Sequence, residues 1–311
     1  MSIIHSIFDE ANNSMNTFFV RAGTGLIVAT VFIAAILLSR ISYGLVVMLV
    51  AAGGVFEFYT ITAKARGASD DKNRRERRLA VILTIVAGLL SWLLNFRYVF
   101  ADLAIVFPVI LFVYFVRALF STSERPFQDI AWGVLPLVYI LLPLLLLNWL
   151  YFEKGELFAL AVLFAVWFYD SFCYIVGSLL GRTKLIERIS PKKTVEGLVG
   201  GMILTLTLVW FYPVLLTYIM NRWHLTCASY SPIQWLVIGF VTIIFATFGD
   251  LVESMLKRSL NIKDSGSIMP GHGGFLDRLD AVLVAIPFAV ATIWLVDQVN
   301  TILSLIDYLR G

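Results

Sequence analysis

Residues 249–280 read GDLVESMLKRSLNIKDSGSIMPGHGGFLDRLD and place a dense cluster of charge between two apolar runs, Ile233–Glu253 and Ala281–Asn300. Ionisable side chains within a membrane are energetically unfavourable, so they usually mark functional sites. The whole chain has 311 residues, of which 59% are hydrophobic and only 14% charged, and its mean hydropathy is +0.86. This composition excludes a soluble domain and indicates an all-α integral membrane protein.

The apolar runs predict a polytopic protein that forms a single integral membrane domain over residues 1–311. A membrane span needs roughly 20 apolar residues. On this criterion we predict about nine transmembrane helices, at Ala22–Ser39, Ile41–Ala63, Leu79–Asn95, Val99–Phe120, Ile130–Tyr151, Leu157–Leu180, Leu198–Met220, Ile233–Glu253 and Ala281–Asn300.

The basic residues predict how the chain is oriented. Lys64–Arg78, Arg182–Lys193 and Lys257–Arg278 are basic, and each follows an even-numbered span. Because Lys and Arg accumulate in cytoplasmic loops, we expect the N-terminus in the cytoplasm, the C-terminus outside and a polar site facing the cytoplasm of a bacterial cytoplasmic (inner) membrane. The first apolar run lacks a small-x-small cleavage pattern, so we interpret it as an uncleaved span.

Carboxylates gather at both ends of the 249–280 segment. Asp250, Glu253 and Ser254 have the spacing of one helix face, and Asp277 and Asp280 repeat that spacing at the start of the next span. Magnesium is commonly bound by one or two carboxylates together with water and substrate phosphates. Two adjoining helix ends that carry carboxylates therefore predict an open metal and phosphate site.

The loop between these helix ends suits a phosphate. Glycine backbone N–H groups approach an anion closely, and flanking cations compensate its charge. The glycines are Gly271, Gly273 and Gly274, and the cations are Lys257, Arg258, Lys263 and Arg278. The residue types leave the role of His272 open among general acid or base, phosphate donor and turn residue.

A second polar cluster, SPKKTVEG at residues 190–197, leads into the seventh predicted span. Lys192, Lys193 and Thr194 lie where a helix N-terminus attracts phosphate, although a topology anchor would explain the lysines as well. Asp170 lies about ten residues, or about 15 Å, inside the sixth span. We favour a polar cavity for Asp170 over a neutral or paired carboxylate, and Glu57 is a weaker candidate of the same kind.

Taken together, Ser254-x-x-Lys257-Arg258, Lys263-Asp264, Pro270-Gly271-His272-Gly273-Gly274 and Asp277-Arg278-x-Asp280 resemble the signature of the phosphatidate cytidylyltransferase family, also called CDP-diacylglycerol synthases. Residues 190–197 resemble a second motif of its bacterial members. The resemblance implies a nucleotidyltransferase that makes CDP-diacylglycerol and pyrophosphate from CTP and phosphatidate.

The same resemblance implies roles for individual residues. Asp250 and Asp277 would bind the metals, magnesium with a potassium ion as the second metal. Around them, the predicted catalytic residues also include Asp280, Lys257 and His272. The predicted substrate-binding residues are Ser254, Arg258, Lys263, Asp264, Gly273, Gly274, Arg278, Lys192, Lys193, Thr194 and Asp170. The expected partners are CTP, phosphatidate, membrane lipid and a second copy in a homodimer, with no nucleic acid.

Two other functions remain open on the sequence. A CTP-dependent polyprenol or phytol kinase would transfer the γ-phosphoryl group instead, and an ion-coupled transporter would use Asp170 and Asp250 as coupling groups. The chain also departs from the family pattern after Asp170, where Ser171-Phe172-Cys173-Tyr174 replaces the usual smaller residues. The bulk of Phe172 and Cys173 leaves the lipid specificity open.

Overall fold

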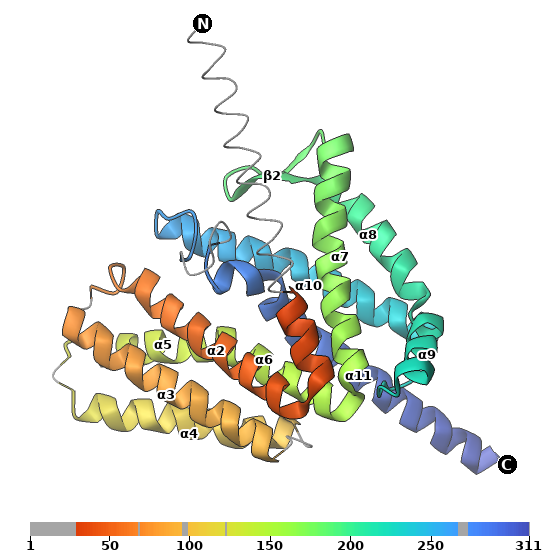
Figure 1. Ribbon diagram of the computed structural model, residues 1–311. Coiled ribbons are helices and arrows are strands. Elements are labelled where there is room, and N and C mark those ends of the chain that lie inside the picture. Colours follow the sequence, from red (N-terminus) through yellow and green to blue (C-terminus); the bar gives the residue numbers. More distant parts are fainter. Residues whose placement is uncertain (1–28, 68, 95–98, 122, 267–272, 311) are drawn as a thin grey trace, which may run out of the picture.

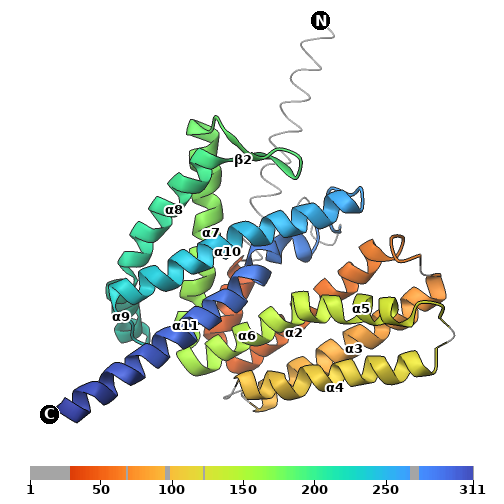
Figure 2. The same ribbon diagram turned by 180° about the vertical axis from the view of Figure 1, so that it is seen from behind.

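The computed structural model describes residues 29–67, 69–94, 99–121, 123–266 and 273–310. These residues are almost entirely helical (Figures 1 and 2), which confirms an all-α membrane fold. The elements are a helix at Ala29–Leu38, α2 (Arg40–Thr62), α3 (Asp70–Leu94), α4 (Val99–Leu119), α5 (Pro126–Pro136), η1 (Leu137–Leu141), α6 (Leu142–Trp149), η2 (Leu150–Lys154), α7 (Glu156–Leu180), β1 (Lys184–Ile186), β2 (Ser190–Thr194), α8 (Val195–Trp210), α9 (Tyr212–Trp223), α10 (Pro232–Ser259) and α11 (Leu276–Arg310).

The predicted number of spans can be compared with the length and apolarity of the helices in the described ranges. Five helical segments there are long and apolar enough to cross a membrane, and six if the bent pair α8 and α9 is one span. The five are α2, the segment Pro126–Lys154, α7, α10 and α11. A helix does lie at each of the nine predicted stretches so far as they are described, but the count of about nine spans is not confirmed.

Proline and capping residues set several helix boundaries. Pro213 lies in the first turn of α9, where its missing N–H ends the hydrogen bonding of α8, and the two axes diverge by 49°. Ser231 and Gln234 form a reciprocal capping box that starts α10. The span Pro126–Lys154 contains two π-helical turns, η1 and η2, and the first directly follows Pro136.

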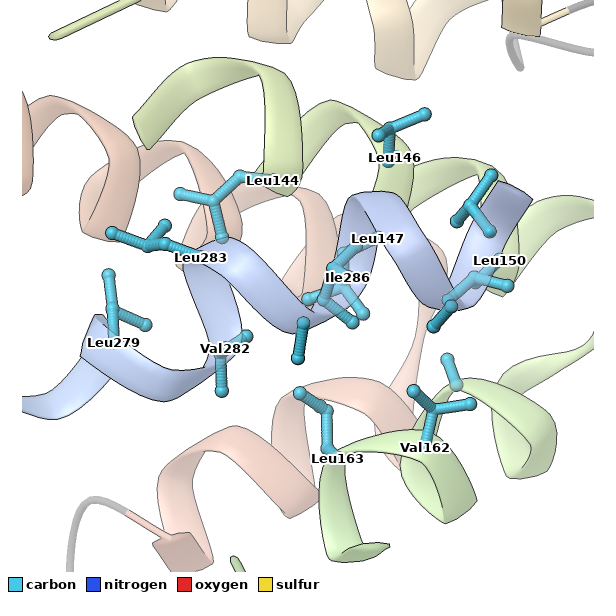
Figure 3. Packing of buried hydrophobic residues seen from close by; sticks show 14 of the residues in the cluster. Leu144, Leu146, Leu147, Leu150, Val162, Leu163, Leu279, Val282, Leu283 and Ile286 are labelled. Carbon is cyan, nitrogen blue, oxygen red and sulfur yellow. The ribbon is translucent and has the colours of Figure 1, made fainter. Parts of the chain in front are cut away.

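The core forms where α11 passes between α6 and α7 (Figure 3). Leu283 and Ile286 of α11 lie close to Leu144 and Leu147 of α6, and Leu163 of α7 lies on the opposite side. The ribbon views place α2, α3, α4 and α5 together on one side of this core, with α7, α8 and α9 on the other (Figures 1 and 2). The starts of α8 and α11 and the ends of α7 and α10 are thereby held around a shared interior.

Two backbone features bring the polar segments to this interior. Gly249 of α10 packs directly against the backbone of Asp280, so α10 and α11 lie close together beside the predicted carboxylates. The second feature is an antiparallel hairpin of β1 and β2 in which Lys184 pairs with Thr194. The sequence analysis predicted no strands here, because residues 190–194 lack the apolar alternation of a strand.

Candidate active site

A cavity of about 710 Å³ lies among α7, the β2 strand, α10 and α11. Apolar side chains from α2, α6 and α7 line one part of it, including Val50, Leu144, Leu147 and Leu163. Another part of the wall is polar and contains eight of the site residues that the sequence analysis predicted. They are Asp170, Lys192, Lys193, Thr194, Asp250, Asp277, Arg278 and Asp280.

Asp277 is held firmly at the first turn of α11. Its Oδ2 atom accepts hydrogen bonds from the Ser265 hydroxyl (2.8 Å), the Ser265 N–H (2.9 Å) and the Gly274 N–H (2.8 Å). Its Oδ1 atom accepts one from Lys257 Nζ at 2.7 Å. Both oxygens therefore have polar partners, and the carboxylate binds Ser265 and Gly274, two residues of the segment that joins α10 to α11.

The lysine beside Asp277 is shared with a second carboxylate on its own helix. Lys257 Nζ also forms an ion pair with Glu253, one turn earlier in α10. Glu253 is only 1% exposed, so the ammonium group compensates a charge that would otherwise be strongly unfavourable in the interior. Lys257 thus joins α10 to α11 through Asp277, although it does not itself line the cavity.

Asp250 connects the two sequence motifs in space. Its Oδ2 atom lies 2.6 Å from Lys193 Nζ, and its Oδ1 atom accepts a hydrogen bond from Ser254 at 3.2 Å. Lys193 is positioned by the hairpin, which ends where Thr194 caps α8 by accepting from the Gly197 N–H. The 190–197 motif therefore meets the 249–280 motif across the cavity, as the shared predicted role in phosphate binding requires.

Two further carboxylates face the cavity with few partners. Among the described residues, Asp280 Oδ1 accepts a hydrogen bond from the adjacent Ala281 N–H, at 2.7 Å. Asp170 makes no hydrogen bond or ion pair with any residue that the structure describes, and its exposed surface faces the cavity. This position agrees with the cavity environment favoured for Asp170 from the sequence.

Not every predicted residue reaches the cavity. Arg258, Lys263 and Asp264 are exposed and lie outside its wall as described. Gly273 and Gly274 lie against Asp277 and Glu57, and Gly273 has a φ of 77°, which favours glycine. His272 lies outside the described residues, together with Pro270 and Gly271.

Glu57 of α2 has a larger structural role than its sequence position suggested. It is 3% exposed, and its Oε2 atom accepts from the Leu276 N–H, the first amide of α11, at 2.9 Å. Gly274 leaves the space that this carboxylate fills, because a Cβ atom at Gly274 would collide with it. The sequence signal for this role was an acidic residue within an apolar helix. Its partner, Leu276, lies 219 residues away, so the sequence did not indicate the contact.

Asp250 and Asp277 offer the type of ligand atom that a magnesium ion prefers. Both residues supply hard carboxylate oxygens at the cavity wall, and a lysine ammonium group lies against each of them. Each carboxylate therefore already sits beside a positive charge. No group of three His, Cys, Asp or Glu side chains converges on one point in the described chain, so any ion would need oxygens from a substrate as well.

The fold and cavity define an integral membrane protein with a charged pocket that reaches apolar helix faces. The family model for the cytidylyltransferase family matches residues 19–296, and the chain belongs to that family. The comparisons do not point to a kinase or a transporter.

Curated relatives agree with this family assignment. The chain is 34% identical to a phosphatidate cytidylyltransferase of Thermotoga maritima over 57% of its length and 65% of the relative's. It is 28% identical to that of Bacillus subtilis over 86% and 94% of the two lengths. For the Staphylococcus saprophyticus enzyme the identity is 35% over 57% and 64%. The first and third matches span just under two thirds of the relatives.

Proposed function

We propose that this protein transfers the cytidylyl group of CTP to phosphatidate, giving CDP-diacylglycerol and pyrophosphate for phospholipid synthesis. The observation that carries the proposal is the 2.6 Å pair between Lys193 and Asp250, which joins two phosphate-binding motifs at one cavity. The family match and the names of the relatives support the same reaction.

The reaction brings two anions together. A phosphate oxygen of phosphatidate attacks the α-phosphorus of CTP, a new P–O bond forms, and the bond to the β-phosphate breaks as pyrophosphate leaves. Lys192, Lys193 and Arg278 line the cavity where these phosphates would meet and reduce their mutual repulsion. No protein nucleophile is required, so catalysis consists of positioning and charge stabilisation.

The carboxylates would hold the metal that this chemistry uses. We assign Asp250 and Asp277 as the ligands of magnesium, with potassium as the second metal. A bound magnesium ion would neutralise phosphate charge and stabilise the leaving pyrophosphate. Lys257 would hold the Asp277 carboxylate in its orientation when no substrate is bound, because it bonds that carboxylate at 2.7 Å.

The two-sided wall of the cavity suits two different substrates. CTP would bind the charged wall from the cytoplasm, whereas the apolar wall, which includes Leu144, Leu147 and Leu163, would contact the lipid. Phosphatidate would then reach the site from the inner leaflet of the cytoplasmic membrane. Membrane lipid would surround the chain, and association into a homodimer stays a prediction.

The reaction is tested with purified protein, phosphatidate, magnesium and CTP labelled at either the α- or the γ-phosphate. We expect α-label in a liponucleotide and γ-label in pyrophosphate. Transfer of γ-label to the lipid would instead establish a lipid kinase and overturn the proposal.

Orientation is tested separately with an impermeant thiol reagent on intact cells, in a background without Cys173 and Cys227. A cysteine in place of Ser69 should be protected, and one in place of Glu153 should react. The opposite pattern would place the cavity away from cytoplasmic CTP.

A further inference from the structure

A second cavity, of about 510 Å³, lies among the start of α3, the end of α4 and the start of α5. None of its lining residues lines the larger cavity. Both cavities lie at the same face of the protein, because α3 follows the end of α2, and α2 contacts the start of α11 through the Glu57 bond to Leu276. The second cavity is therefore a separate compartment on the side where the basic loops gather.

The charge in this cavity is not balanced by its own acids. Lys72, Arg75 and Arg117 line it, against the carboxylates of Asp129 and Glu76. Lys72 Nζ binds both oxygens of Asp129, at 2.7 and 2.9 Å.

Glu76 is neutralised from behind the cavity wall. It is 6% exposed, and Arg66, which does not line the cavity, binds its Oε2 atom at 2.7 Å. Arg117 lies 3.7 Å from the other Glu76 oxygen. Two positive charges, on Arg75 and Arg117, thus exceed what the acids of the cavity compensate.

Arg75 is the most available of these cations. Its one hydrogen bond to a described residue runs from Nε to the carbonyl oxygen of Asp71, at 3.4 Å, and it forms no ion pair within the described chain. A guanidinium group whose terminal nitrogens have no acidic partner is well suited to bind a phosphate through two parallel hydrogen bonds.

The rim of the cavity indicates where such a phosphate comes from. Phe120 lines the cavity and is 85% exposed, and its neighbours Leu119 and Phe127 are 80% and 77% exposed. In a membrane protein these apolar side chains contact lipid rather than water. The cavity therefore opens where the head-group layer meets the acyl chains. A free nucleotide would have no acyl chain to contact Phe120.

We infer that this second cavity binds the phosphate head group of an anionic phospholipid, with Arg75 and Arg117 on the phosphate and the acyl chains against Phe120. The site is distinct from the proposed reaction site and needs neither CTP nor a metal. Attraction of this kind is typical of basic pockets at the cytoplasmic surface of membrane proteins.

The test uses the full-length protein in phosphatidylcholine vesicles that contain photoreactive phosphatidylglycerol. Adducts on peptides within residues 114–130 are quantified, so lipid in the larger cavity is not counted. Arg75→Gln should lower these adducts by about tenfold, in keeping with one strong charge-assisted contact. Arg78→Gln is the matched control, since Arg78 is an exposed cation on the same helix outside the cavity, and it should leave the adducts unchanged.

Equal adducts in wild type and Arg75→Gln would overturn the inference, as would an equal loss in Arg78→Gln. Arg75 is exposed and makes one hydrogen bond to a described residue, a backbone carbonyl, so its substitution should not unfold the protein. Inorganic phosphate at millimolar concentration should not displace the lipid. Displacement by inorganic phosphate would show a site for free phosphate and overturn the lipid assignment.

Discussion

The α10–α11 junction and the middle of α7 each present a carboxylate to the same cavity. The two carboxylates differ in how many hydrogen-bond partners hold them. Asp277 at the junction accepts four hydrogen bonds and is held from both sides of the loop. Asp170 in α7 has no such partner within the described chain. The sequence analysis treated both as site residues of one kind, but their surroundings differ.

The difference separates a fixed group from an adaptable one. Preorganised groups stabilise a transition state without having to reorient during the reaction. Asp277 meets that description, because moving it would break contacts to Lys257, Ser265 and Gly274. Asp170 is free to respond to whichever substrate occupies the cavity. We therefore expect substitutions at the junction to reduce turnover and substitutions in α7 to change substrate binding.

The largest effect is expected from Asp277→Asn. Asparagine keeps the shape of the side chain but removes the negative charge that magnesium and Lys257 require, so kcat should fall by about two orders of magnitude or more. Steady-state kinetics across a magnesium titration measures this. Near-normal turnover at any magnesium concentration would show that the carboxylate is only structural.

The corresponding change in α10 tests whether the two acids act as one unit. Asp250→Asn should reduce kcat by a similar factor of about one hundred. The double variant should be scarcely worse than either single one, because residues that act together are strongly non-additive. Multiplicative losses in the double variant would instead indicate two independent roles.

A smaller effect is expected from Glu57→Ala, which removes the cap on α11 without touching the cavity wall. The Leu276 N–H would lose a buried acceptor, at a cost of about 1–3 kcal/mol, and Asp277 would lose part of its positioning. We expect activity to fall about tenfold and the thermal midpoint to drop by several degrees.

Glu57→Gln is the control for that variant, since its carbonyl oxygen still accepts from Leu276. It should retain most of the activity and stability. If alanine and glutamine behave alike and both remain near wild type, Glu57 does not position the junction.

In α7 the expected change is mainly in affinity. Asp170→Asn should alter KM for phosphatidate by a few-fold and leave kcat within about threefold, because no described contact depends on its charge. Initial rates over a range of lipid concentrations separate the two constants. A loss in kcat as large as that of Asp277→Asn would abolish the distinction between the two regions.

The cavity was predictable from the sequence where the motifs are compact. Asp250 and Asp277 flank one short loop, and the lysines at 192 and 193 directly precede a helix, so local spacing suffices to predict their shared position. Glu57 was harder to predict, because a contact over 219 residues depends on how α2 packs against α11. The β1–β2 hairpin was missed because it is stabilised by backbone pairing and the cap on α8 rather than by apolar alternation.

The predicted count of about nine spans is not confirmed for a related reason. Apolar runs predict where helices form, and helices do lie at those positions in the described residues. Whether a helix can cross the membrane also depends on its unbroken length. Within the described ranges, the bend between α8 and α9 separates two helices that reach the length of a span only together.

Small losses of turnover should come from the two serines that bond Asp277 and Asp250. Ser265→Ala removes a buried hydroxyl that donates to Asp277 at 2.8 Å, but the Ser265 N–H and Gly274 N–H bonds remain, so we expect about a three- to fivefold loss of kcat. Ser254→Ala removes a longer bond, of 3.2 Å, to Asp250, and the loss should stay below about twofold. Parallel kcat measurements on the two variants decide the order. A larger loss at Ser254 than at Ser265 would mean that Asp250, and not Asp277, is the more tightly positioned carboxylate, which would reverse the role assigned to the junction.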